Sequence, residues 1–138
     1  MKKWWMLFPV FLLLAACQMS PPSLSVKADG KSLKVYQGSY CWQSMGKGEC
    51  ADTGGPADII GEDEPKTVKA GSEAVLSFWG DPDQLYISLE GRQETVELSM
   101  KDGKASVSLP SEPGVYQYGV HGNWEQGDAT YVFQIKIE

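Results

Sequence analysis

Short runs in which apolar and polar residues alternate dominate the chain from residue 26 onward. Residues 105–109 alternate apolar side chains with serines, and the last run, 131–137, is apolar at every second position, with Gln134 and Lys136 on the other face. A period of two residues is typical of strands with one buried face, and no persuasive 3.6-residue periodicity competes with it. The pattern therefore predicts an all-β protein.

Glycine and proline turns divide these runs. Asp-Gly pairs at positions 29–30 and 102–103 are tight-hairpin signals. The acidic, proline-ended turn at 62–65 is a plausible boundary. We therefore expect an N-terminal β/loop module over residues 26–64, followed by a β-sandwich over residues 65–138.

Four local expectations complete this outline. Residues 46–56 are rich in glycine and are expected to form a loop, followed by a short apolar island at 59–60. Val68 is expected to open a strand. Trp79 ends a strongly alternating run and is expected to lie in the core.

About seven predicted strands within roughly seventy residues favour an antiparallel sandwich, with a small barrel as the alternative. Residues 112–118 (EPGVYQY) resemble the corner motif that precedes the penultimate strand of immunoglobulin-like domains. The resemblance implies that the Tyr116 hydroxyl bonds back to the corner backbone. Tyr118 stands where those domains have a cysteine. The expected fold is an antiparallel immunoglobulin-like β-sandwich with an N-terminal disulfide-bearing β extension.

The N-terminus has a different character. Lys2 and Lys3 precede an apolar run over residues 4–14, which is shorter than the roughly 20 residues of a membrane-spanning helix. Small residues follow the run. A charged start, a short apolar stretch and small residues predict a secretory signal peptide over residues 1–16.

The sequence Leu14-Ala15-Ala16-Cys17 resembles the lipobox of bacterial lipoproteins. The resemblance implies that the Cys17 sulfur receives a diacylglyceryl group and that Cys17 becomes the mature N-terminus. Residues 17–25 would then form a lipidated, proline-rich tether at the extracytoplasmic face of the cell membrane. An ordinary secreted protein with an unmodified thiol is the alternative.

Charge narrows the range of partners. The chain has 12 basic and 18 acidic residues, and its net charge of −6 argues against a nucleic-acid partner. Removal of Lys2 and Lys3 with the signal peptide leaves 10 basic residues against 18 acidic ones, or −8. Anionic lipid would repel such a domain, so acyl chains would have to anchor it.

Three cysteines are an odd count. If Cys17 carries lipid, Cys41 and Cys50 remain as a pair that can oxidise outside the cytoplasm. Reduced thiols or a metal site are the alternatives. Zinc would need two more ligands, and His121 is far away in the sequence.

Residues suited to catalysis are few, so we do not expect an enzyme or a cofactor. His121 is the only imidazole and is expected to be an exposed histidine at a sheet edge. No G-x-S-x-G turn is present, and the paired carboxylates fall in turns. The acidic residues 62–64 offer oxygen ligands for calcium, but no calcium-loop motif surrounds them. We expect no metal site.

Aromatic residues are more informative. Trp42 adjoins Cys41 and is expected to pack against the disulfide, with ligand binding as the alternative. Trp124 lies in a polar loop, where it either folds back as a lid or is presented for binding. The candidate binding residues are Trp42, Trp124 and Asp128, within the loop regions 41–50 and 122–128.

Residues 36–42, 50–52, 114–118 and 124–133 together are similar to small uncharacterised surface lipoproteins of Gram-positive bacteria. That resemblance implies a location and a domain plan, but no activity. The sandwich is also distantly similar to bacterial immunoglobulin-like proteinase inhibitors, although no inhibitory loop matches.

The predicted function is a membrane-anchored, non-enzymatic interaction domain whose partner is an envelope protein or ligand. The alternatives are a small-ligand or calcium-binding lipoprotein and a proteinase-inhibitor-like module.

Overall fold

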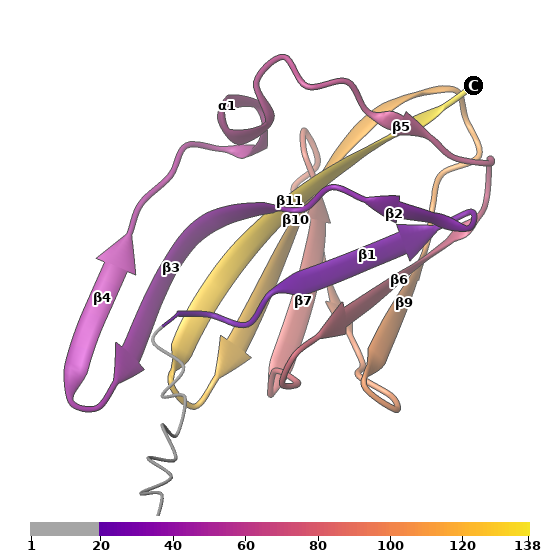
Figure 1. Cartoon of the computed structure of the whole chain (residues 1–138). Helices are drawn as coiled ribbons and strands as arrows, with labels where there is room; N and C mark the ends of the chain where they lie inside the picture. Colours follow the sequence, from indigo (N-terminus) through magenta and orange to yellow (C-terminus); the bar gives the residue numbers. More distant parts are fainter. Residues whose placement is uncertain (1–19) are drawn as a thin grey trace, which may run out of the picture.

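Two antiparallel sheets face each other in the computed structural model, which describes residues 20–138 (Figure 1). The predicted signal peptide and the lipobox residue Cys17 lie outside the described residues. No helix within residues 20–138 is long and apolar enough to cross a membrane. The all-β prediction is confirmed.

The smaller sheet has the order β2-β1-β6-β9. The larger sheet has the order β4-β3-β11-β10-β7-β8, and β5 pairs in parallel with β11. The elements are β1 (Leu24–Ala28), β2 (Lys31–Leu33), β3 (Tyr36–Ser44), β4 (Lys47–Ala51), α1 (Pro56–Ile60), β5 (Lys66–Thr67), β6 (Glu73–Phe78), β7 (Gln84–Leu89), β8 (Thr95–Leu98), β9 (Lys104–Ser108), β10 (Gly114–Trp124) and β11 (Gly127–Ile137).

The core lies between the two sheets and is built by the alternating positions. In β1 the burial pattern alternates strictly, and in β6 Ala74 and Leu76 are fully buried. Strand β11 departs from the prediction because Gln134 is buried on its outer face. The segment after α1 covers this position, where the Gln134 amide donates a 2.8 Å hydrogen bond to the Asp63 carbonyl.

Strands from both predicted segments share both sheets. From the segment 26–64, β1 pairs with β6 and β3 pairs with β11. The predicted tether also overlaps the sandwich, because Leu24 and Ser25 belong to β1. Pro22 is buried, and its carbonyl accepts a hydrogen bond from the Tyr131 hydroxyl. Only the residues before Pro22 are left to act as a tether.

Three local expectations were wrong. The expected loop at 46–56 contains β4, which completes a hairpin with β3. The apolar island at 59–60 is the end of α1, too short for its periodicity to be recognised. Trp79 is 83% exposed, because the buried positions of β6 are the even-numbered residues and the strand ends at Phe78. The strand expected at Val68 is β5, which ends one residue earlier.

The expected tyrosine corner is confirmed. The Tyr116 hydroxyl donates a 2.8 Å hydrogen bond to the Glu112 carbonyl. Tyr118 points into the core and stacks on Phe133, with 4.9 Å between ring centroids. Aromatic stacking thus occupies the place where the resembling domains carry a disulfide.

Two buried tyrosines predict a loss of stability at alkaline pH. Burial raises the pKa of Tyr118 to about 12, and burial also raises the pKa of Tyr131. Because an unfolded tyrosine ionises near pH 10, the unfolded chain loses protons there that the folded chain keeps. Stability should be complete below pH 10 and then fall by about 1.4 kcal/mol per pH unit for each tyrosine up to pH 12. Urea unfolding at pH 8 and pH 11 measures this change, and equal stabilities would contradict it.

Candidate functional site

The predicted disulfide between Cys41 and Cys50 is confirmed and joins β3 to β4. The two cysteines are directly paired across the hairpin, with 4.1 Å between their Cα atoms. Both are exposed. Since Trp42 on the same strand points into the sandwich, Cys41 and the disulfide lie on the outer face of the larger sheet.

A groove of about 310 Å³ lies beside the disulfide. Its lining comes from residues 41–43 of β3, residues 48–50 of β3's partner β4, and residues 125–128 at the β10–β11 turn. The Gln43 amide donates a 2.9 Å hydrogen bond to the Gln126 carbonyl and holds the two hairpins together. We call this feature the disulfide groove.

Gly127 is required where the two hairpins meet. Its φ is +155°, and a Cβ atom there would lie 2.0 Å from the Cys41 carbonyl oxygen. Only a residue without a side chain allows the β10–β11 turn to approach β3 this closely. The backbone of the groove therefore depends on this glycine.

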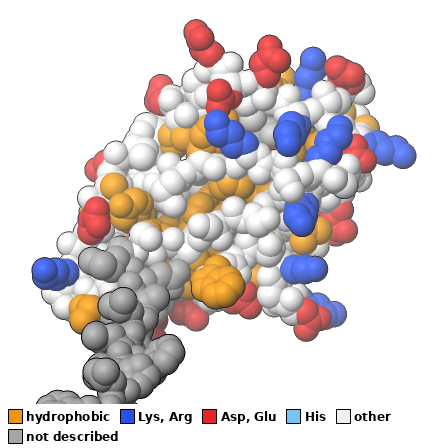
Figure 2. Space-filling view, viewed as in Figure 1, with side chains coloured by type: hydrophobic (Ala, Val, Ile, Leu, Met, Phe, Trp, Pro, Cys, Tyr) orange, Lys and Arg blue, Asp and Glu red, His pale blue; other side chains and the backbone are white. Residues whose placement is uncertain are grey.

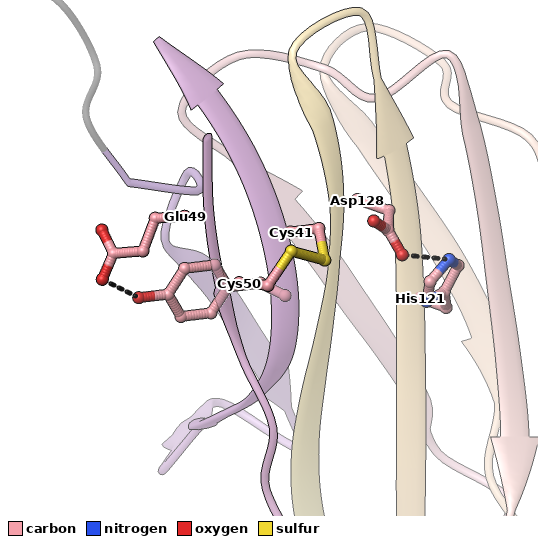
Figure 3. Close-up of a disulfide and its surroundings, with 6 residues drawn as sticks. Cys41, Glu49, Cys50, His121 and Asp128 are labelled. Carbon is pink, nitrogen blue, oxygen red and sulfur yellow. Dashed lines mark hydrogen bonds and ion pairs between the residues drawn. A yellow bond between two sulfur atoms is a disulfide. The ribbon is translucent and has the colours of Figure 1, made fainter. Parts of the chain in front are cut away.

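Asp128 and His121 continue the row of side chains that begins at the disulfide (Figure 3). Asp128 is paired with Cys41 across β11 and β3, and its carboxylate lies 3.5 Å from His121 Nε2. His121 Nδ1 is 3.1 Å from the Thr130 hydroxyl, and Nε2 is 3.2 Å from Asn123 Oδ1. Both ring nitrogens of His121 thus have polar neighbours.

The expected position of His121 at a sheet edge was wrong. Strand β10 lies between β11 and β7 in the interior of the larger sheet. The side chain is 39% exposed and lies among Thr130, Asn123 and Asp128. Its place became clear only from the strand order, which the single sequence does not contain.

The two candidate tryptophans pack beneath the groove. Trp42 is 2% exposed, and its ring meets the Trp124 ring edge-on with 5.7 Å between centroids. Trp124 also packs edge-on against Phe78 at 5.3 Å, and its indole nitrogen donates a 2.9 Å hydrogen bond to the Gly80 carbonyl. Trp124 is therefore folded back as a lid on the end of the sandwich.

The expected packing of Trp42 against the disulfide was wrong. Trp42 and Cys41 are neighbours in one strand, so their side chains point to opposite faces of the sheet. Of the three candidate binding residues, Asp128 is the one whose side chain reaches solvent beside the groove, 46% exposed. Gln43 and Gln126 are exposed groove residues that the sequence patterns did not single out.

The acidic turn at 62–64 serves a structural role. Asp63 accepts hydrogen bonds from the Lys34 ammonium at 2.8 Å and the Tyr36 hydroxyl at 2.6 Å. The hydrogen bond from Lys34, and then that from Tyr36, holds the pKa of the Asp63 carboxyl below its ordinary value. Within residues 20–138, no three His, Cys, Asp or Glu side chains gather so as to hold a metal ion.

Removal of the disulfide should destabilise the protein moderately. The double variant Cys41→Ser/Cys50→Ser should unfold with a free energy lower by about 2–3 kcal/mol, the entropy of a closed loop of this length. Urea denaturation measures the change. Since the bond joins two exposed positions, the core should stay intact and the near-UV spectrum should be retained. A double variant as stable as the parent would contradict this expectation.

The candidate site is thus a polar groove on the outer sheet face, built by two hairpins and floored by a disulfide. Comparison of the chain with protein-family models, curated proteins and solved structures found no match. The chemistry that the groove offers consists of amide, carboxylate and imidazole groups, together with exposed backbone.

Proposed function

We propose that the protein is a lipid-anchored lipoprotein of the extracytoplasmic membrane face that binds a partner protein of the cell envelope, without catalysis, at the disulfide groove. One observation carries the proposal. The regions 41–50 and 122–128, far apart in the sequence, meet in a single groove and are joined there by the Gln43–Gln126 hydrogen bond. An accessible groove on a rigid sheet is a typical binding surface.

The anchoring half of the proposal is supported by the sequence before residue 20. The run Leu14-Ala15-Ala16-Cys17 resembles a lipobox, and the mature charge of −8 leaves attachment to acyl chains rather than to electrostatic attraction. The Cys41–Cys50 disulfide agrees with an oxidising compartment.

The immunoglobulin-like description of the sandwich is part of the proposal. It is supported by two facing antiparallel sheets and by the hydrogen bond from Tyr116 to the Glu112 carbonyl. Such domains present their hairpin turns at the two ends of the sandwich. The disulfide groove occupies one of these ends and the adjoining sheet face.

The edge strand β4 gives the partner a defined mode of attachment. Strand β4 ends the larger sheet, and four of its five residues are exposed. An open edge can pair with an extended segment of a partner, which gains backbone hydrogen bonds. Gln43 and Gln126 would add side-chain hydrogen bonds, and Asp128 favours a basic residue in that segment.

The non-enzymatic part of the proposal rests on the groups available in the groove. Both sulfur atoms are joined to each other, so neither is a free nucleophile. The His121 ring is held between Thr130 and Asn123, beside Asp128. This arrangement positions the imidazole for hydrogen bonding at the surface.

Photo-cross-linking in cells that produce the protein tests the binding surface. A benzophenone amino acid at Gln43 or Gln126 should yield a discrete adduct with an envelope protein. The same group at Ser106, exposed on the outer face of the smaller sheet, is the matched control and should yield none. Equal adducts at all three positions, or none at any of them, would overturn the proposed surface.

A further inference from the structure

Two large apolar side chains protrude from the same end of the sandwich. Trp79 is 83% exposed and Met45 is 80% exposed. Trp79 follows Phe78, and Met45 follows β3 three residues after Trp42; both Phe78 and Trp42 pack on Trp124. This end, at the bottom of Figure 1, also shows hydrophobic side chains at the surface in Figure 2. We call it the Trp79 end.

Met45 occupies a position that ordinarily favours a small polar residue. Three hairpin tips of the sandwich have a residue with positive φ followed by a positive-φ glycine, and two of them carry aspartate, Asp29 and Asp102. Met45 takes the same conformation with φ +51°. Aspartate, asparagine and glycine adopt this left-handed conformation most readily. The exposed methionine is therefore unfavourable for the hairpin itself, which points to a contact outside the domain.

The chain enters the sandwich near this end. Leu24, the first residue of β1, is paired with Phe78, which directly precedes Trp79. Cys17 lies only three residues before Ser20, where the described chain begins, so their Cα atoms can be at most about 11 Å apart. A lipid on Cys17 would hold the Trp79 end close to the bilayer.

We infer, on the basis of the proposed lipid anchor, that Trp79 and Met45 lie in the interfacial layer of the bilayer that holds the Cys17 acyl chains. Tryptophan prefers this layer because its large ring is apolar while its N–H stays hydrated. Methionine adds a flexible apolar side chain. The anchor makes even a weak contact effective, because it keeps the end of the domain at the membrane surface.

Charges at this end neither drive nor prevent the contact. Acidic residues Asp81, Asp83 and Glu125 lie in the same loops and turns, and Lys47 and Lys101 are their basic neighbours. Because both signs are present, we expect the contact to form on a zwitterionic membrane. The disulfide groove, whose lining includes the turn residue Glu125, would then open sideways next to the membrane surface.

Quenching of tryptophan fluorescence by lipid-bound nitroxides tests the inference. The full protein, purified with its anchor from membranes, is placed in phosphatidylcholine vesicles with a nitroxide near the headgroup. The parent should be quenched, and Trp79→Phe should lose most of that quenching. Trp42 is buried and Trp124 is packed against it, so neither should replace the lost signal.

Two matched variants separate membrane contact from folding. Met45→Asn should weaken the quenching while it keeps or raises the melting temperature, because asparagine suits the hairpin tip. Val115→Asn changes a residue that is 55% exposed at the opposite end of β10 and should leave the quenching unchanged.

The outcomes distinguish the inference from the proposed function. An acylated protein with equal quenching in the parent and Trp79→Phe would overturn the membrane contact and leave the anchor standing. Mass spectrometry that finds no acyl group on the purified protein would overturn both. Selective loss of quenching in Trp79→Phe and Met45→Asn would support the inference.

Discussion

Replacement of Trp42 by alanine is expected to lower the free energy of unfolding by about 3–5 kcal/mol. Trp42 is 2% exposed, and its ring packs edge-on against Trp124, which in turn packs on Phe78. Removal of the indole leaves a cavity under the disulfide groove and deprives Trp124 of its support. Equilibrium urea denaturation followed by circular dichroism measures the loss.

Trp42→Phe is the matched control, because it retains an aromatic edge-to-face partner for Trp124 and much of the buried area. It should cost clearly less than the alanine variant. If Trp42→Ala unfolds within about 1 kcal/mol of the parent, Trp42 is not a core residue and the packing described under the groove is wrong.

Gly127→Ala should destabilise the protein by about 3–4 kcal/mol, since it combines steric overlap with backbone strain. The new Cβ atom would lie 2.0 Å from the Cys41 carbonyl oxygen and 3.1 Å from the Trp42 Cα atom. Backbone atoms cannot move aside as a flexible side chain can, so β3 and the β10–β11 turn would have to separate. The disulfide groove should lose its shape as well as its stability.

Gly55→Ala provides the control for this substitution. Gly55 has φ −70°, and no atom lies within 4 Å of the position that an alanine Cβ would take, so alanine should be tolerated. Thermal unfolding of both variants gives the comparison, and photo-cross-linking from Gln43 reports the groove. A Gly127→Ala protein with the parent's melting temperature would contradict the close approach of the two hairpins.

The sequence was most informative where a local rule determines the structure. The period-two pattern predicted the buried face of β11 at Tyr131, Phe133 and Ile135, and the corner motif predicted the Tyr116 hydrogen bond. The pairing of Cys41 with Cys50 followed from setting Cys17 aside. Each of these features depends on residues close together in the chain or on a simple alternation.

Features that depend on strand order were not predicted. The interior position of His121 and the cover over Gln134 arise from pairings between strands distant in sequence. Trp79 was misplaced because a single alternating run does not say which parity faces the core. Strand β4 was hidden because its exposed edge position removes the apolar alternation.

The groove was only half visible in the sequence. Both contributing loop regions were identified, but their contact depends on Gly127 pairing with Trp42 across β11 and β3. The tryptophans attracted attention as binding residues, whereas they pack beneath the surface. The side chains left at the surface are the less distinctive Gln43, Gln126 and Asp128.

The attachment of the domain to a membrane through Cys17 is the central claim, and the N-terminal peptide of the mature protein tests it most directly. Mass spectrometry of protein isolated from the membranes of producing cells should find a peptide that begins at Cys17 and carries a diacylglyceryl thioether. A peptide that begins elsewhere, or that begins at Cys17 with a free thiol, would contradict the account.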